Sequence, residues 1–162
     1  MPLRIIKILL ILAIAAWALL GALGNIVDWS GTTGAVQAAT SMSTFDPVPA
    51  SDRATSNLLV VLLGAVFITL LKIATGALCL LGAWQMWSAR SAQATSFARA
   101  KTWALAGCGL AMFMLFAGWI VIAETWYELW RSPIMLEPVL GSAFRYCGMI
   151  GVIALFVGAQ EP

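Results

Sequence analysis

Lys72 is the residue with the clearest potential for chemistry, because it is the only charged residue in a long apolar run from Asn57 to Trp87. An ammonium inside a bilayer costs roughly 2.5–3.5 kcal/mol on insertion scales, so such a residue usually has a pairing or functional role. Four interpretations are open: contact with a neighbouring protein, contact with a lipid head group, a position near the outer membrane surface, or a transport or catalytic role. The apolar cores of the other segments contain no Asp or Glu, so the sequence predicts no partner for Lys72 at its own depth.

The sequence contains no histidine, which excludes His-ligated haem, zinc and copper sites and His-based acid–base catalysis for this chain alone. Cys79, Cys108 and Cys147 all lie in apolar runs without C-x-x-C spacing. We interpret them as small packing residues rather than as a disulfide framework. The sequence therefore predicts no catalytic residues, no cofactor, no metal and no enzymatic activity.

Two pairs of polar residues are candidates for structural roles. Asn25 and Asp28, spaced i, i+3 just after the first apolar run, are expected to cap that helix end and to order the loop that follows. Glu124 and Arg145 fall at the same outer level of the third and fourth apolar runs, and we predict that they form a structural ion pair.

Tryptophans mark the ends of two apolar runs. Trp84 and Trp87 close the second run, and Trp126 and Trp130 close the third. Indole rings prefer the lipid head-group level, so this pattern is typical of a membrane-interface belt. Together with Lys72, these four tryptophans are the candidates for contact with lipid or with a partner protein.

The composition is that of a membrane protein. Hydrophobic residues make up 62% of the 162 residues and charged residues 10%, against roughly 25% charged in soluble domains. A net charge of +2 without a basic cluster gives no indication of nucleic-acid binding. Apolar runs of about 20 residues are long enough to cross a bilayer. We predict one membrane domain with helices at about 5–24, 57–87, 102–130 and 142–159.

The first run and the loop after it leave alternatives open. The basic start and the small residues at 22–24 also fit a signal peptide, but we interpret 5–24 as the first membrane helix. Residues 25–56 are rich in Gly, Ser, Thr, Asp and Pro, and for a loop of this length we expect a short helix around 34–40 or packing against a partner.

The charge distribution predicts the orientation. Inner segments would hold five basic residues and one acid, and outer segments three basic residues and six acids; the inner group is Arg4, Lys7, Arg90, Arg99, Lys101 and Glu161. The positive-inside rule then places both termini in the cytoplasm and the long loop in the periplasm of a bacterial inner membrane. The fold class is therefore all-α: a four-helix polytopic membrane protein with one long periplasmic loop.

The order and spacing of several short pieces resemble one family. They are Asn25 and Asp28, residues 36–37 and 41–42 of the loop, residues 53–54, Gly82-Ala83-Trp84 with Trp87, Phe97 with residues 99–101, Trp126-Tyr127 with Trp130, and residues 143–146. In these the chain resembles the bacterial predicted small integral membrane proteins of a domain-of-unknown-function family. The resemblance implies a four-helix membrane fold and no established activity.

Two positions depart from the family pattern. Members of the family that this chain resembles carry a glutamate at the position of Lys72. They also carry a glutamate directly before the tryptophan, where this chain has Thr125, and Glu124 lies one place earlier. Lys72 and Glu124 are therefore not family site residues.

Two functions compete on this evidence. The leading hypothesis is a structural or accessory subunit of a larger inner-membrane complex, which contacts other integral membrane subunits and lipid through helix packing and the outer loop. The alternative is a small oligomeric transporter or channel that uses Lys72 for an anionic solute. The absence of a catalytic constellation favours both over an enzyme.

Overall fold

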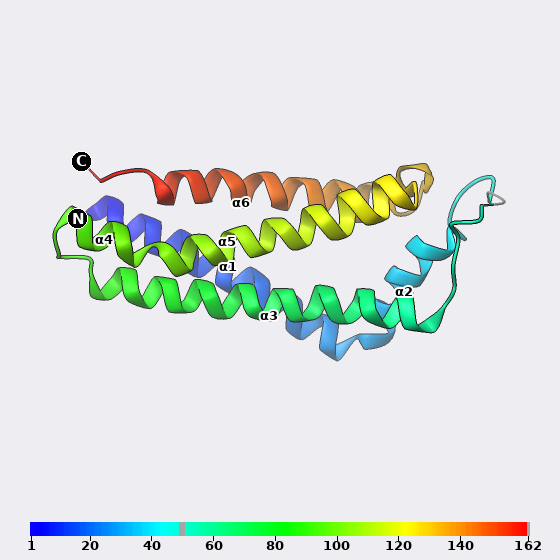
Figure 1. The fold of residues 1–162 in the computed structure, drawn as a ribbon, viewed down its shortest axis with the longest axis horizontal. Coiled ribbons are helices and arrows are strands. Elements are labelled where there is room, and N and C mark those ends of the chain that lie inside the picture. The colour runs from blue at the N-terminus through cyan, green and yellow to red at the C-terminus, as the bar shows by residue number, and fades with distance from the viewer. Residues whose placement is uncertain (49–50, 162) are drawn as a thin grey trace.

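Four long apolar helical segments run side by side in the computed structural model, which describes residues 1–48 and 51–161 (Figure 1). The spans are Pro2–Val27, Leu58–Ser88, Ala94–Trp126 and Leu136–Gly158, each long and apolar enough to cross a membrane. No strand occurs in these described ranges. The predicted all-α fold with four membrane helices is therefore confirmed.

The first two spans are single helices, and the last two are built from shorter pieces. The first span is α1 (Pro2–Val27) and the second is α3 (Leu58–Ser88). The third consists of α4 (Ala94–Ala100), α5 (Thr102–Phe113) and η1 (Met114–Trp126), and the fourth of η3 (Leu136–Gly141) and α6 (Ser142–Gly158). A short η2 (Leu129–Arg131) lies between the third and fourth spans.

Helix α3 is the centre of the bundle, with contacts to α1, α2 and α5. Small residues let its neighbours approach closely. Thr75, Cys79 and Ala83 are all buried at four-residue spacing, and a Cβ atom at Gly82 would overlap the backbone nitrogen of Ala104 on α5. Close backbone approach through small residues stabilises helix pairs in membranes, where water gives little driving force.

The fourth span packs on the third through a similar set of small residues. Ala143 is buried, and the Sγ atom of Cys147 lies 4.0 Å from the carbonyl oxygen of Met112. A Cβ atom at Gly151 would lie 3.5 Å from the Met112 side chain, which is ordinary van der Waals contact. These residues place α6 against α5 and η1.

The loop between the first two spans contains a longer helix than expected. Helix α2 runs Trp29–Ser41 and begins five residues before the predicted 34–40 segment. It packs on α3, and the backbone N–H of Thr55 donates to the Thr40 carbonyl at 2.9 Å, which returns the chain to the bundle. Asn57 then caps α3, its Oδ1 accepting from the Leu59 N–H at 2.9 Å.

The third span begins and ends earlier than the predicted 102–130. Part of the segment between the predicted helices 57–87 and 102–130 is helical, as α4, and the third span stops at Trp126. Tyr127 still donates its N–H to the Ile122 carbonyl, but Glu128 takes a left-handed conformation with φ of 53°, which ends the winding. The fourth span starts at Leu136, before the predicted 142. Pro138 lies in its first helical turn, where proline is tolerated.

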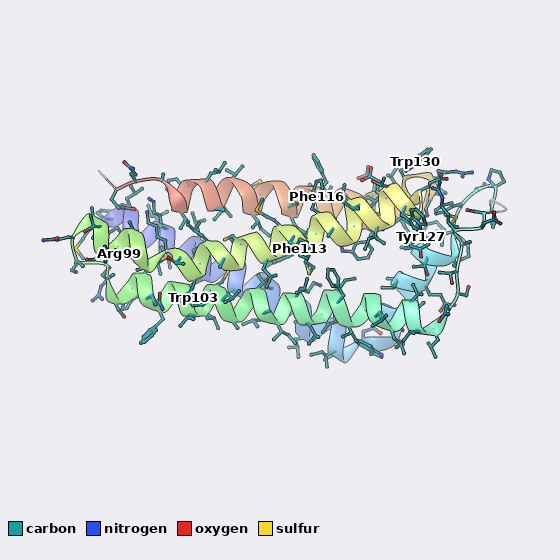
Figure 2. All side chains as sticks on the ribbon, viewed as in Figure 1. Arg99, Trp103, Phe113, Phe116, Tyr127 and Trp130 are labelled. Carbon is teal, nitrogen blue, oxygen red and sulfur yellow. The ribbon has the colours of Figure 1, made fainter. Side chains whose placement is uncertain are left out.

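Both chain ends lie at one end of the bundle, together with the link between α3 and α4 (Figure 1). We call this the terminal end. The opposite end carries α2, the loop at 42–57 and the turn between the third and fourth spans, and we call it the loop end. Arg99 lies at the terminal end, and Tyr127 and Trp130 lie at the loop end (Figure 2).

Candidate functional site

A break between two helices places polar groups beside Lys72. Helix α1 ends at Val27 and α2 begins at Trp29, with Asp28 between them. The Asp28 Oδ1 atom accepts from the Gly31 N–H at 2.9 Å and from the Ser30 hydroxyl at 3.1 Å. Its backbone N–H donates to the Gly24 carbonyl at 2.9 Å, so Asp28 closes the end of α1, as expected, and also caps the start of α2. A Cβ atom at Gly31 would overlap this carboxylate, so a larger residue there would displace the Asp28 side chain.

Asn25, in the last turn of α1, connects α1 to α3. Its side-chain carbonyl accepts from the Lys72 ammonium at 3.3 Å, and its amide nitrogen donates to the Thr69 hydroxyl at 3.4 Å. The carbonyl oxygen of Asn25 also accepts from the Thr32 hydroxyl at 3.2 Å. Asn25 thus binds Lys72 and holds both sides of the helix break.

The expectation that Lys72 has no partner at its own depth is wrong. Sequence reasoning considered only carboxylates within the apolar cores and so passed over Asn25. Along α1, Asn25 follows Lys7 by 18 residues, which is about 27 Å at 1.5 Å per residue. Lys7 belongs to a charged cluster at the terminal end, described below. Along α3, Lys72 is 14 residues from Leu58 and 16 from Ser88, so it lies close to the middle of a helix about 46 Å long. The interpretation that places Lys72 near the outer surface stays a prediction.

A polar cavity of about 300 Å³ surrounds the half-buried Lys72 side chain. It lies between the end of α1, α2 and α3, with Asn25, Asp28 and Thr32 in its wall. Asn25 is the one hydrogen-bond acceptor of the Lys72 ammonium among residues 1–48 and 51–161. Since an ammonium has three N–H donors, two remain for a ligand in what we call the lysine cavity.

A larger apolar cavity of about 520 Å³ adjoins the lysine cavity between α2, α3 and η1. The two cavities share Val36, Ile68 and Trp119 in their walls. The wall of the larger cavity is apolar apart from Thr40, Trp119 and Tyr127, and Gly118 leaves room inside it, because a Cβ atom there would meet only the Phe67 ring at 3.6 Å. We call this the apolar cavity. An elongated hydrophobic space thus ends one helical turn from an ammonium group, because Ile68 and Lys72 are spaced i, i+4 on α3.

The wall formed by η1 has an unusual helical geometry. The Thr125 hydroxyl donates to the Ile120 carbonyl at 2.9 Å and the Tyr127 N–H to the Ile122 carbonyl at 3.0 Å, both five residues back. This is π-helical winding from Met114 to Trp126. Such segments are often found at functional sites, and here the segment carries Trp119 into both cavity walls.

The same winding accounts for a wrong prediction. Glu124 and Arg145 form no ion pair within the ranges that the structure describes. A period of 3.6 residues no longer gives the face of a residue on a π-helix, so Glu124 does not lie where α-helical geometry placed it. Arg145 donates to the Ser142 hydroxyl at 3.3 Å. The acid that pairs at this end is Glu128, at 2.9 Å from Arg131 and 3.5 Å from Arg53.

A buried charged cluster lies at the terminal end, and sequence reasoning missed it. The Glu161 carboxylate lies 2.7 Å from the Lys7 ammonium, 2.8 Å from the Lys101 ammonium and 3.8 Å from the Arg4 Nε atom. Side-chain exposure is only 1–3% for both lysines and the glutamate. Both lysines also donate to the Ala159 carbonyl. We call Arg4, Lys7, Lys101 and Glu161 the terminal charge cluster.

The electrostatics of this cluster favour the ionised carboxylate. Burial acts to raise the pKa of Glu161, but the hydrogen bonds and positive charges of Lys101 and Lys7 outweigh it, and the pKa lies below its ordinary value. The signal was present in the sequence, because Glu161 is the single acid among the inner basic residues.

The four candidate tryptophans are exposed on the outside of the bundle. The exposed fraction is 67% for Trp84 and 56% for Trp130, and Trp87 and Trp126 are similarly open. The Arg90 guanidinium stacks on Trp87 at 4.4 Å and that of Arg53 on Trp126 at 5.1 Å. Tyr127, between Trp126 and Trp130 in sequence, is instead buried. Contact of these tryptophans with lipid or a partner protein stays a prediction.

The predictions about metals and cofactors rest on the sequence. Over the described ranges, no group of three or more His, Cys, Asp or Glu side chains has the arrangement of a metal site. Cys79, Cys108 and Cys147 are free thiols. The lysine cavity and the apolar cavity can accommodate an organic anion with a hydrophobic part, and this is the chemistry that the geometry offers.

Comparison with known proteins identifies the family. The family model described as "Predicted small integral membrane protein (DUF2165)" matches residues 3–160. No curated protein and no solved structure gives a significant match. The match covers nearly the whole chain and agrees with the four apolar helices and with the resemblance noted in the sequence. The chain therefore belongs to the family of predicted small integral membrane proteins.

Proposed function

We propose that the protein binds an amphiphile with one anionic head group, with the head group at Lys72 and the hydrophobic chain in the apolar cavity. The observation that carries this proposal is the adjacency of the two cavities through Val36, Ile68 and Trp119. Ligand sites are typically concave, mostly apolar and of about 300–1,000 Å³, with a few polar groups that fix orientation. The combination here matches an amphiphile better than a small inorganic ion.

Charge complementarity supports an anionic head group. Asp28 also lines the lysine cavity, but its carboxylate already accepts hydrogen bonds at the N-terminus of α2. The positive end of the helix dipole compensates a capping carboxylate. Lys72 is the one basic side chain in the wall of the cavity, and its hydrogen-bond partner among the described residues is the neutral amide of Asn25.

The proposal is closest to the transporter alternative for this chain. Interrupted helices whose ends face a ligand are a recurring feature of membrane transporters, and the break at Asp28 lies in the wall of the lysine cavity. The accessory-subunit hypothesis and contacts with other membrane subunits stay predictions. A lysine without a partner inside the chain is one of the reasons for them, beside the missing histidines, the absence of a catalytic constellation and the long outer loop, and the contact with Asn25 removes that one reason.

The Lys72→Gln change should weaken binding of oleate about tenfold or more, because a hydrogen-bonded ion pair is lost. Scintillation proximity with tritium-labelled oleate and the purified full chain in detergent measures this directly. Oleyl alcohol, which has the same chain and no charge, should bind native and variant protein equally. The Arg99→Gln variant removes an exposed charge at the terminal end and should leave oleate binding unchanged.

The Gly118→Leu variant tests the apolar cavity, where the hydrophobic chain of the ligand would bind, separately from Lys72. Gly118 lines the apolar cavity, and a Cβ atom there would contact only the Phe67 ring at 3.6 Å. A leucine should fill the cavity and weaken both oleate and oleyl alcohol. Equal oleate binding by native protein and Lys72→Gln would refute the proposal. Loss of a co-purifying membrane protein in Lys72→Gln, with oleate binding intact, would favour the accessory-subunit hypothesis instead.

The orientation predicted from charge is part of the proposal, with the terminal end in the cytoplasm of a bacterial inner membrane. Arg4, Lys7, Arg90 and Lys101 lie at that end, and the helix break and both cavities then face the periplasmic half. A reporter that works only in the cytoplasm should be active when it is fused after Gln93. A reporter that works only in the periplasm should be active when it is fused after Thr44. The reverse pattern would invert the direction from which an amphiphile reaches Lys72.

A further inference from the structure

Among the residues that the structure describes, the terminal end carries more positive charge than its one carboxylate, Glu161, neutralises. Four cationic side chains lie there in or beside the terminal charge cluster: Arg4, Lys7, Arg90 and Lys101. Within the described part of the chain, Glu161 is the one carboxylate among them. Lys7 and Lys101 each have this carboxylate and the Ala159 carbonyl as close partners. Lys7 and Lys101 share this one carboxylate, and Arg4 and Arg90 add two further positive charges at this end.

Arg4 and Arg90 line a common cavity of about 330 Å³, with Ser91 and Glu161 also in its wall. The Arg4 Nη1 atom donates to the carbonyls of Arg90 and Ala92, at 2.9 and 2.7 Å, which fixes this guanidinium against the link between α3 and α4. Its Nε atom is 3.8 Å from the Glu161 carboxylate. Its Nη2 atom has no hydrogen-bond partner among the residues that the structure describes, so this donor is available to a ligand.

Arg90 is held in a similar way. Its Nη1 atom donates to the Trp87 carbonyl at 2.8 Å, and its guanidinium stacks on the exposed Trp87 ring. Trp87 marks the head-group level on this side of the bundle, since indoles concentrate there. The cavity between the two arginines, which we call the arginine cavity, therefore lies at the depth of lipid phosphates.

We propose that the arginine cavity binds the phosphate of an anionic phospholipid, with Arg4 and Arg90 as its ligands. Guanidinium groups bind phosphate oxygens through paired N–H donors, which gives both strength and orientation. The Glu161 carboxylate also borders the cavity, and its charge is compensated by the Lys7 and Lys101 ammonium groups. This site is independent of the amphiphile site at Lys72.

Native mass spectrometry of the full chain in detergent, titrated with phosphatidylglycerol, tests the proposal. The Arg90→Gln variant should lower the apparent affinity for phosphatidylglycerol about tenfold, because a charge-assisted contact is lost. Phosphatidylcholine should bind weakly to native protein and variant alike. The matched control is Arg99→Gln, which removes an exposed arginine at the same end and should leave the affinity unchanged.

Three further measurements make the outcome decisive. The Arg90→Lys variant keeps the charge and should retain part of the affinity, which separates ligand loss from misfolding. In a Lys72→Gln background, where the proposed amphiphile site no longer holds an anionic head group, Arg90→Gln should still lower the affinity for phosphatidylglycerol about tenfold, so that a failure of one site leaves the other interpretable. Equal loss in Arg90→Gln and Arg99→Gln would overturn the proposal, since it would show only surface attraction. Displacement of the lipid by millimolar inorganic phosphate would overturn it too, because the ligand would then be free phosphate.

Discussion

Replacing Glu161 with alanine is expected to lower the melting temperature of the protein by about 10 °C. The change leaves Lys7 and Lys101 buried and close together without their carboxylate. Removing one partner of a buried ion pair typically costs about 3–5 kcal/mol, because the remaining charge is desolvated without compensation. Tryptophan fluorescence during heating in detergent measures the transition. Glu137→Gln, which removes an exposed carboxylate, should leave it unchanged.

The same contact should make the terminal end sensitive to acid. The folded chain holds the pKa of Glu161 below its ordinary value of 4.5, so the folded state favours the ionised carboxylate. Its contribution to stability is complete above pH 4.5 and is lost as the pH falls through the lower, folded value. The Glu161→Gln variant should lack this pH dependence. If it melts like the native chain at pH 7, Glu161 does not hold the terminal end together.

The Gly82→Ala change is expected to destabilise the bundle by about 3 kcal/mol or more, although alanine favours helices by roughly 1 kcal/mol over glycine. A Cβ atom at position 82 would overlap the backbone of Ala104, so α3 and α5 would have to separate. Separation would also disturb the buried Cys79 and Cys108. Thermal melting and loss of monodispersity in detergent are the measurements.

Glycines elsewhere in the bundle supply a matched control for Gly82→Ala. Nothing lies within 4 Å of a Cβ atom built at Gly109 or at Gly148. Alanine at either position should therefore leave the melting temperature unchanged or raise it slightly. An unchanged melting temperature for Gly82→Ala would mean that α3 and α5 are not held at this close approach.

The membrane fold could be predicted from the sequence because it depends on long apolar runs, which carry their signal locally. The long run that contains Lys72 forms α3, which contacts α1, α2 and α5. The residues at which the helices begin and end were harder to predict. The third helix stops at Trp126 because Glu128 adopts a left-handed conformation, and hydropathy contains no information about such a turn.

The candidate site could be predicted only in part. Lys72 was identified because a charge in an apolar run is conspicuous, but its neighbours come from a different helix and lie at that helix's end. Asn25 was assigned to a cap, whereas the fold turns its amide towards Lys72 and Thr69. The cavities depend on the separation between η1 and α3 and on the path of α2. Neither is determined by local sequence pattern.

The contact between Lys7 and Glu161 has a consequence for biogenesis. The two residues are 154 positions apart, so the first helix can meet this carboxylate only after the other three spans have been synthesised. Membrane helices insert individually and associate afterwards. During translation, the first and third spans must therefore reach the bilayer with Lys7 and Lys101 still hydrated at its cytoplasmic edge in the proposed orientation. Closure of this end therefore follows synthesis of all four spans.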